Sequence, residues 1–270
     1  MEGSAYLELN NCLINDVYVG LNGLGVITIR QNSVLKMTNT TIQKTYITGP
    51  LAKSGGVYVD DPNTKAMLYN CTFKDIGSFG HKDSPENRYA EWGGAIKSYG
   101  TLYCDGCNFI NCTAEYGAAI YIQDSTSHVN IQNSNFINCK AMTSGIIYLE
   151  GKNINDVRFT NCSFIDNKVI KKDGVIYLEG ENIKDVRFTN CSFIDNQVKR
   201  DGIIYLNNAY DAVSLTDCSF INNRIGRYGL FYCDSTDQAI SLTKCSFINN
   251  ILYHINEGSF VFFLGFLFCF

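Results

Sequence analysis

The twelve residues DVRFTNCSFIDN occupy Asp156–Asn167, and the same twelve recur unchanged at Asp185–Asn196, 29 residues further on. Weaker copies, each centred on an apolar anchor, run along most of the chain. The anchors are Ile14, Ile42, Phe73, Phe109, Phe136, Phe164, Phe193, Phe220 and Phe247. Their spacings lie between 27 and 31 residues, except for one interval of 36. A period in this range is typical of a solenoid, in which each unit buries its apolar face only against its neighbours.

A second block recurs between the anchors. It consists of short β-branched and aromatic runs opened by glycine, such as GIIYL at Gly145 and GVIYL at Gly174. Such runs have the composition of a strand that follows a turn. The anchor block alternates as well, since Val157 and Phe159 are apolar while Arg158 between them is not. No segment between the anchors keeps a 3.6-residue apolar period, so the chain is predicted to be all-β.

The period and the strand pattern distinguish among solenoids. Leucine-rich repeats fit by length, but this sequence lacks their leucine pattern and their helix. Hexapeptide β-helices need a six-residue period, which is absent from this sequence. We therefore predict a right-handed parallel β-helix, a pectin-lyase-like β-solenoid of about nine coils of roughly 27–31 residues. Residues 1–250 form this repeat domain, and residues 251–270 form an apolar C-terminal segment. That segment is interpreted as a cap or a truncated membrane anchor, because its last eleven apolar residues are too few to span a bilayer.

Composition argues against some classes of function. Hydrophobic residues make up 46% of the chain, which is enough for a core, whereas a charged fraction of 18% and a net charge of −4 argue against nucleic acid as a partner. Twelve cysteines weakly favour an oxidising compartment. No signal peptide is visible in the first residues, and the first repeat begins almost at Met1. These features favour a fragment of a longer protein, or a sequence that has lost its signal peptide.

Two short motifs carry a family resemblance. The run Gly93–Ile96 reads GGAI, and Phe-x-x-Asn occurs at Phe164–Asn167 and in the three following repeats. In these motifs the chain resembles polymorphic outer-membrane-protein-like adhesins and related right-handed β-helix surface proteins of protist parasites and archaea. Two repeats depart from the pattern, because Cys112 and Cys139 stand where the asparagine is expected. The resemblance implies a non-enzymatic, extracellular or cell-surface protein, an adhesin-like or structural display rod. Its partner would be a glycan or protein of a host or neighbouring cell.

Cysteine dominates one column of the repeat. The column reads Cys12, Thr40, Cys71, Cys107, Ser134, Cys162, Cys191, Cys218 and Cys245. Because two members are not cysteine, and because parallel Cβ vectors aim poorly for a disulfide, we predict a ladder of small, buried, reduced thiols. Disulfides between Cys112 and Cys139, or between Cys104 and Cys107, remain open alternatives. The single CxxC has no second pair and no nearby histidine, so no metal and no cofactor are expected.

Asparagine marks the corners of the repeat. One column precedes the cysteines and another follows the anchors, from Asn167 to Asn250. Asparagine tolerates tight corners, and its side chain can bond to turn backbone or to its own copy in the next coil. A rival interpretation is glycosylation, because five asparagines of the chain open Asn-x-Ser/Thr sequons: Asn39, Asn70, Asn111, Asn161 and Asn190. A buried corner asparagine could not carry a glycan.

Tyrosine fills a third column, which reads Thr28, Tyr58, Lys97, Tyr121, Tyr148, Tyr177, Tyr205 and Tyr232. Its neighbours, such as Ile176 and Leu178, are apolar, so alternation points them inward and the tyrosines outward. We expect an exposed aromatic strip. Stacked rings that stabilise the sheet are one interpretation, and a binding face for a glycan or a protein is the other. Trp92, in the longest loop together with His81, Arg88 and Glu91, joins this candidate site.

An enzyme is the alternative function, because many polysaccharide lyases and glycoside hydrolases use this scaffold. Fold alone does not establish activity, and a glycosidase needs two carboxylates held at a defined separation. Asp60 and Asp61 are adjacent, but Pro62 and Asn63 make that stretch an ordinary turn. No acidic pair is expected to recur across the repeats. A basic ridge, Lys168 to Arg227, and an acidic ridge on the opposite turns are interpreted as solvated loops.

Overall fold

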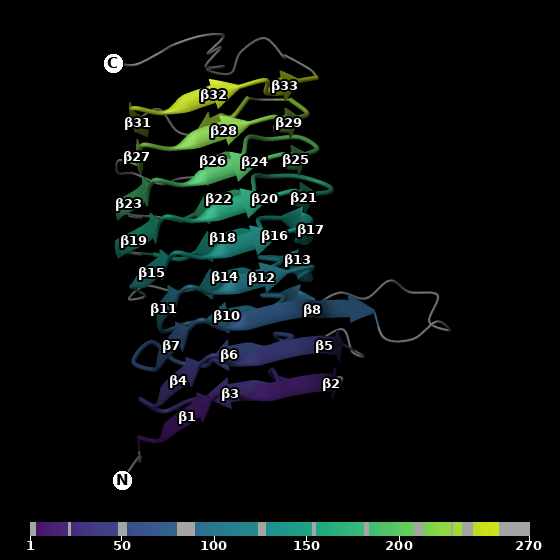
Figure 1. Ribbon diagram of the computed structural model, residues 1–270, viewed down its shortest axis with the longest axis vertical. Helices are drawn as coiled ribbons and strands as arrows, with labels where there is room; N and C mark the ends of the chain where they lie inside the picture. The colour runs from purple at the N-terminus through teal and green to yellow at the C-terminus, as the bar shows by residue number, and fades with distance from the viewer. Residues whose placement is uncertain are drawn as a thin grey trace.

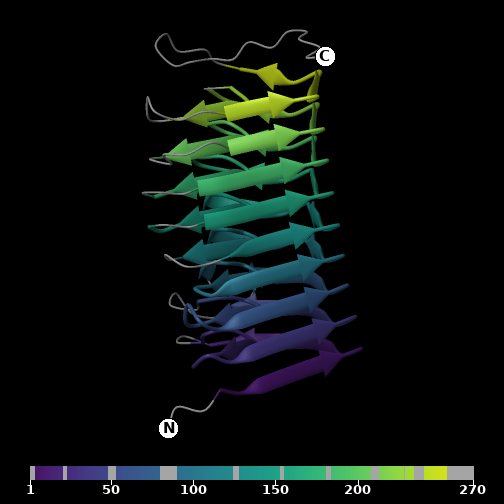
Figure 2. The ribbon, with the colours of Figure 1, turned by 90° about the vertical axis from the view of Figure 1, so that its left-hand side faces the viewer.

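The chain forms a stack of short parallel strands wound around one axis. The computed structural model describes residues 4–20, 23–47, 53–79, 90–123, 128–152, 155–180, 184–207, 213–227, 229–233 and 240–253. In these ranges every regular element is a strand. Figures 1 and 2 show the strands stacked from the N-terminal coil to the C-terminal coil along the long axis. The predicted all-β parallel β-helix is confirmed.

Four parallel sheets run along the stack. Sheet A consists of β1 (Tyr6–Asn10), β4 (Val34–Thr38), β7 (Lys65–Tyr69), β11 (Thr101–Asp105), β15 (Val129–Gln132), β19 (Asn155–Thr160), β23 (Lys184–Thr189), β27 (Val213–Thr216) and β31 (Ile240–Thr243). Sheet B consists of β2 (Leu13–Val19), β5 (Thr41–Ile47), β8 (Thr72–Phe79), β12 (Asn108–Ile110), β16 (Asn135–Ile137), β20 (Ser163–Ile165), β24 (Ser192–Ile194), β28 (Ser219–Ile221) and β32 (Ser246–Ile248).

Sheets C and D complete each coil, and the chain visits the sheets in the order A, B, D, C. Sheet C consists of β3 (Ile27–Ile29), β6 (Val57–Val59), β10 (Ile96–Ser98), β14 (Ile120–Gln123), β18 (Ile147–Glu150), β22 (Ile176–Glu179), β26 (Ile204–Asn207) and β30 (Phe231–Cys233). Sheet D consists of β9 (Ala90–Trp92), β13 (Thr113–Tyr116), β17 (Lys140–Ser144), β21 (Lys168–Val169), β25 (Gln197–Val198), β29 (Arg224–Ile225) and β33 (Ile251–Leu252).

The coil count is close to the prediction. Sheets A and B each hold nine strands, sheet C holds eight and sheet D holds seven. The first two coils have no sheet D strand, and the ninth has no sheet C strand within the described ranges. The β-helix also extends past the expected boundary at residue 250, because β33 pairs in parallel with β29. Residues 254–270, which hold the rest of the predicted apolar segment, lie outside the described residues.

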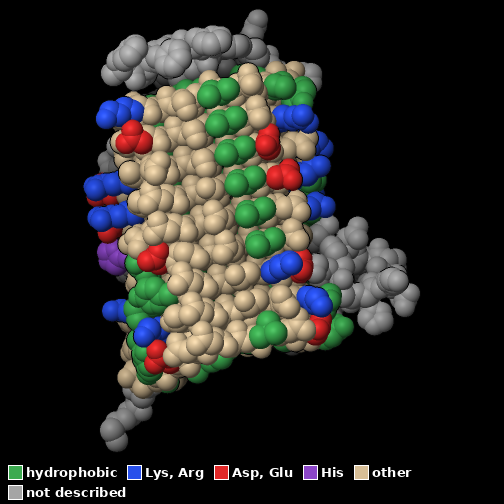
Figure 3. Space-filling view, in the orientation of Figure 1, with side chains coloured by type: hydrophobic (Ala, Val, Ile, Leu, Met, Phe, Trp, Pro, Cys, Tyr) green, Lys and Arg blue, Asp and Glu red, His purple; other side chains and the backbone are tan. Residues whose placement is uncertain are grey.

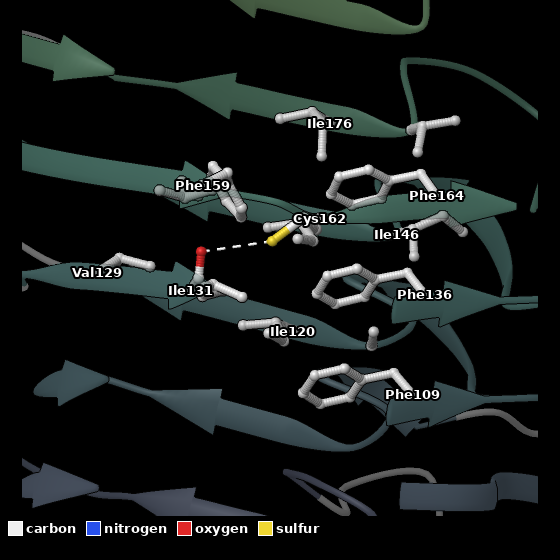
Figure 4. Packing of buried hydrophobic residues seen from close by; sticks show 14 of the residues in the cluster. Phe109, Ile120, Val129, Ile131, Phe136, Ile146, Phe159, Cys162, Phe164 and Ile176 are labelled. Atoms are coloured by element: carbon white, nitrogen blue, oxygen red, sulfur yellow. Dashed lines mark hydrogen bonds between the residues drawn. The ribbon is translucent and has the colours of Figure 1, made fainter. Parts of the chain in front are cut away.

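The anchor column forms the centre of the core. Each anchor is paired in register with its copy in the next coil, from Ile14 and Ile42 through to Phe220 and Phe247. Phe109, Phe136 and Phe164 stack with ring centroids 4.8 and 4.7 Å apart and planes within 5° of parallel (Figure 4). Stacked rings add about 0.5–1.5 kcal/mol per pair to the stabilisation from burial. Identical side chains therefore stabilise one another on neighbouring coils, which is why duplication of a coil is tolerated.

The cysteine column is a ladder of thiols, as predicted. Nine of the ten cysteines whose side chains are described are buried, and all ten are free thiols, so neither alternative disulfide is present among them. The Cys162 thiol donates to the carbonyl oxygen of Ile131 in the preceding coil, at 3.4 Å (Figure 4). Ser134 uses its hydroxyl in the same column, donating to the Gln132 carbonyl at 2.7 Å. Each member is thus a small donor aimed at backbone oxygen.

The two asparagine columns differ in burial. Those that precede the cysteines adopt left-handed backbone conformations, with φ of 53° at Asn161 and 50° at Asn190, where asparagine is favoured among the residues with a side chain. Asn190 donates to Asn161 Oδ1 at 2.9 Å, yet both side chains are exposed. The premise that a laddered corner asparagine is buried is therefore wrong for these two sequons. In the second column Asn167, Asn196 and Asn223 are buried, and Asn250 in the last described coil is partly buried.

Candidate functional site

Five tyrosines form a continuous column on sheet C. They pair in register on β14, β18, β22, β26 and β30. Successive rings from Tyr121 to Tyr232 lie 5.0, 4.6, 4.9 and 4.9 Å apart. The expected exposed strip is wrong, however. The exposed fraction of the residue is 1% at Tyr121, 6% at Tyr148 and Tyr177, and 8% at Tyr205, and Tyr232 is partly buried.

The corner between sheets D and C lies close to two tyrosines of this column. Gly117 and Gly145 turn that corner with φ of 61° and 66°, a conformation that glycine adopts at little cost. A Cβ added to Gly117 would lie 2.9 Å from the Tyr121 Cβ, and one on Gly145 would lie 3.1 Å from the Tyr148 Cβ. At these two coils the corner backbone thus lies close to the base of the tyrosine side chain. Tyr116, at the end of β13, packs against the same cluster and closes it further.

Carboxylates border the other side of the column. On β18 and β22 the tyrosine is followed two residues later by an acid on the same face of the strand. The Tyr121 hydroxyl donates to Glu150 in the next coil, and the Tyr148 hydroxyl donates to Glu179. Burial, reinforced by the bonded carboxylate, raises the pKa of the Tyr121 and Tyr148 phenols well above the usual value. The phenols are therefore neutral donors and are not candidates for nucleophiles or bases.

Lysine replaces tyrosine in one coil and completes an aromatic cluster. Lys97 pairs in register with Tyr58 on one side and Tyr121 on the other. Its ammonium lies 4.2 Å from the Trp92 ring centroid and 5.1 Å from the centroid of Tyr121, and the residue is 2% exposed. Cation–π attraction is strongest where water is excluded, as it is here. Trp92, predicted to bind a partner from a protruding loop, instead packs against the tyrosine column.

An acidic pair across coils was not expected, yet the structure contains one. Asp173 and Asp201 precede the glycines of consecutive coils, and the Asp173 backbone N–H donates to Asp201 Oδ2 at 3.1 Å. Ser144, in the preceding coil, donates to the Asp173 carboxylate. Burial, followed by the hydrogen bond to Asp173, raises the pKa of Asp201 to about 6. The Asp-Gly that precedes two consecutive sheet C strands, β22 and β26, was the sequence signal for this pair.

The other predicted acidic candidates have structural roles. Asp60 forms an ion pair with Arg30 at 2.6 Å, and Asp61 accepts hydrogen bonds from the Asn63 N–H and the Thr64 hydroxyl. The stretch is therefore a capped turn, as the sequence indicates. Of the long-loop residues, His81 and Arg88 lie outside the described residues. No group of three or more potential metal ligands occurs within the parts of the chain that the structure describes.

Comparison with known families agrees with this geometry. A family model described as a right-handed β-helix region matches residues 1–185 and 103–262. This chain belongs to the right-handed β-helix family. The finer resemblance to polymorphic outer-membrane-protein-like adhesins is not part of that match and remains a prediction. No curated protein matches the chain.

Among solved structures, this β-helix chain shows a weak likeness to one described as "a new PL6 alginate lyase complex with trisaccharide". The two share 12% sequence identity, the likeness covers 97% of this chain and 82% of the other, and the TM-score is 0.22. A likeness of that size supports no statement about activity. Within the described ranges, the β-helix contains no helix with the length and apolarity that a membrane span requires.

The remaining predicted residues of the β-helix occupy the expected places. Phe109 to Phe220 are 0% exposed, and Phe247 is partly buried in the last described coil. Cys162, Cys191 and Cys218 are 1% exposed, and Cys245 is 7% exposed. The phenylalanine and cysteine columns are therefore structural. The tyrosine column is a second, smaller apolar cluster outside the main core.

Proposed function

We propose that this β-helix is a non-enzymatic display rod of the cell surface, adhesin-like, whose outer faces bind a glycan or protein of a host or neighbouring cell. The observation that carries the proposal is the parallel, largely in-register stacking of strands along all four sheets, in which the register shifts at Thr45/Tyr46 and at Ala114/Tyr116. It turns each outward position of the repeat into a column of like side chains. A surface built in this way can bind a repetitive partner at many points without any catalytic centre.

The outer face of sheet B illustrates such a column. Six isoleucines follow the phenylalanine anchors and pair in register from coil to coil: Ile110, Ile137, Ile165, Ile194, Ile221 and Ile248. None of them is fully buried. Figure 3 shows the resulting line of hydrophobic side chains, with charged side chains at its edge. Exposed apolar side chains in a contiguous line are a feature of interaction surfaces.

The proposal is tested by binding of the purified full chain. Fluorescently labelled protein is incubated with intact cells and with an array of glycans, and bound label is measured at increasing concentration. Saturable binding to at least one cell type or glycan is expected. A rod that binds no cell and no glycan would be a spacer, and the display function would then be wrong.

The second candidate is a carbohydrate-active enzyme, either a polysaccharide lyase or a glycoside hydrolase. The Asp173–Asp201 pair favours it, because a carboxylic acid with a raised pKa beside a second carboxylate is the arrangement used for general acid catalysis. Against it, Asp201 is only 4% exposed and both carboxylates already accept hydrogen bonds from neighbours. Release of reducing ends or unsaturated uronides from a polysaccharide panel, abolished by Asp201→Asn, would establish the enzyme.

A further inference from the structure

The corner between sheets A and B carries four of the five sequons. Asn39, Asn70, Asn161 and Asn190 each stand between the end of a sheet A strand and the start of a sheet B strand, and all four are exposed. Their φ angles lie between 47° and 53°, so the four share one turn conformation. These sequons therefore lie along one edge of the rod, and their asparagines face solvent.

Asn161 and Asn190 belong to the duplicated twelve residues and form a hydrogen-bond ladder. Asn190 Nδ2 donates to Asn161 Oδ1 at 2.9 Å, and Asn161 Nδ2 donates to Asn133 Oδ1 at 3.0 Å. Asn161 thus accepts from the coil that follows it and donates to the coil that precedes it. A side-chain amide has two hydrogens, and the ladder uses one of them.

The geometry of the amide shows which hydrogen remains. The carbonyl of Asn161 points toward one neighbouring coil and its donated N–H points toward the other, so the donated hydrogen is antiparallel to the C=O bond. The second hydrogen lies on the same side as Oδ1, and no hydrogen bond between described residues uses it. A substituted amide places its substituent on that side, as a trans peptide does. A sugar attached there leaves both ladder bonds in place.

The hydroxyl of each sequon lies beside the same corner. Ser163 and Ser192 are the first residues of β20 and β24, pair in register and are partly exposed. The Ser192 hydroxyl donates to the Ser163 hydroxyl at 3.1 Å. The sequon needs this hydroxyl for transfer of the glycan. In the folded chain the hydroxyls bond to each other, so they do not compete for the asparagine amides.

We infer that Asn161 and Asn190 are N-glycosylation sites, whose glycans project from the corner between sheets A and B while the asparagine ladder stays intact. In the transfer, the Nδ2–H bond of asparagine and the C1–O bond of a lipid-diphosphate-linked oligosaccharide break. The Nδ2–C1 bond forms, and the proton leaves with the lipid diphosphate. The inference goes beyond the display function but rests on the same cell-surface setting, because such glycans belong to the exposed surfaces of secreted proteins.

Site occupancy is the first measurement. The full chain is secreted from a eukaryotic host behind a cleavable leader, and its glycans are removed enzymatically in heavy-oxygen water, which converts each occupied asparagine into a labelled aspartate. Peptide mapping then locates the label. We expect Asn161 to be labelled in S192A and Asn190 to be labelled in S163A, each with complete loss of label at the other site.

The single variants and a matched control separate the two sites. Consecutive coils place Asn161 and Asn190 about 4.8 Å apart, where one bulky glycan can obstruct its neighbour, so each sequon is tested without the other. S219A is the control, because Ser219 holds the same register position one coil later, where Asp217 replaces the sequon asparagine. This variant should keep the label of the wild type at both sites.

Thermal melting measures whether the ladder survives. The wild type and S163A/S192A are each prepared without glycans from bacteria, and as secreted protein whose glycans are trimmed to one sugar. The change in melting temperature between the two preparations should agree between the two proteins within about 2 °C. A fall of about 4 °C or more that is confined to the wild type would show that the sugars break the ladder, and would overturn the inference.

The remaining outcomes also decide the question. An unlabelled Asn161 in S192A, together with an unlabelled Asn190 in S163A, would reject both sites, and so would label that persists at Asn161 in S163A. Binding of cells by a chain with both sites empty would reject the glycans and leave the display function intact. Occupied sites in a chain that binds no cell and no glycan array would support the glycans and count against that function.

Discussion

The side-chain amide of Asn196 donates a hydrogen bond of 2.8 Å to the carbonyl oxygen of Phe164 in the preceding coil. Its Oδ1 atom accepts from both the backbone N–H and the side chain of Asn167, at 3.0 and 2.9 Å. Asn223 repeats the pattern one coil later. These buried amides join consecutive coils at the turn between sheets B and D, where the backbone alone leaves polar groups unpaired.

Asn196→Ala is expected to destabilise the fold by about 2–4 kcal/mol, because it leaves the Asn167 N–H and the Phe164 carbonyl buried without this partner. Asn196→Cys is expected to destabilise the fold by less, about 1–2 kcal/mol, because a thiol can still donate to the carbonyl oxygen in the preceding coil. Cys139 shows this in the same column, donating to the Phe109 carbonyl at 3.4 Å. Thermal melting of the wild type and of the two variants measures which substitution costs more stability. Equal losses for alanine and cysteine would show that the donor contributes nothing.

The interior of this fold could be predicted from the sequence because register makes it repetitive. Phe164 and Phe193 lie in identical twelve-residue contexts, so one residue's position fixes the next. The same repetition predicted reduced thiols in the cysteine column. Ser134 and Thr40 stand in that column and can supply a buried hydrogen-bond donor, but neither can form a disulfide. Repetition thus converts a weak local signal into a strong one.

The candidate site could not be predicted equally well, because alternation assigns a side chain to a face but does not say whether that face is covered. Tyr121 and Tyr148 do lie outside the main core, yet they are buried in a cluster of their own against which Trp92 and Tyr116 pack. The signal was present in the glycine that opens each block. That glycine indicated a turn. The sequence does not show how close the turn lies to the tyrosine, because this depends on the tertiary structure.

The tyrosine column is expected to contribute stability rather than direct binding. Tyr177→Ser removes a buried ring that is stacked on Tyr205 and tilted against Tyr148, and should cost about 3–5 kcal/mol. Tyr177→Phe keeps the ring but loses the 3.1 Å hydrogen bond donated to Glu179 and the 3.4 Å hydrogen bond accepted from Asn207, and should cost about 1–2 kcal/mol. Chemical denaturation separates the two. The combined phenylalanine variant at Tyr148, Tyr177 and Tyr205 is the control, and loss of cell binding in that folded variant would make the column a binding face after all.

The thiol ladder is expected to resist modification while the chain is folded. The neighbouring Cys191 thiol, followed by burial, raises the pKa of Cys218 to about 12, so almost no thiolate forms at pH 8. A thiol reagent at that pH should therefore react fast with the partly exposed Cys12 and slowly with Cys218. Burial also slows the other thiols of the column, including Cys162, whose pKa the Cys191 thiol lowers. Cys12→Ser should remove one fast equivalent, whereas Cys218→Ser should leave the fast phase unchanged. A fast phase that shrinks in Cys218→Ser would contradict the buried ladder.

The Asp173–Asp201 pair is expected to make stability depend on pH. An aspartate ordinarily titrates near 3.8, and burial together with Asp173 raises the pKa of Asp201 to about 6. The folded chain therefore holds this proton more tightly than the unfolded chain does. The stabilisation is complete below pH 3.8 and is lost as the pH rises through about 6. A two-unit shift corresponds to about 3 kcal/mol at most, and solvent screening leaves on the order of 1 kcal/mol.

Asp201→Asn removes that titration while it keeps an oxygen to accept from the Asp173 N–H. The variant should therefore melt at a higher temperature than the wild type above pH 7, and the difference should vanish near pH 4. Asp217→Asn is the matched control, because Asp217 is exposed and occupies the corner column where Asn190 stands in the preceding coil. A stability difference for Asp201→Asn that stays constant from pH 4 to pH 8 would show that folding does not raise the pKa of Asp201.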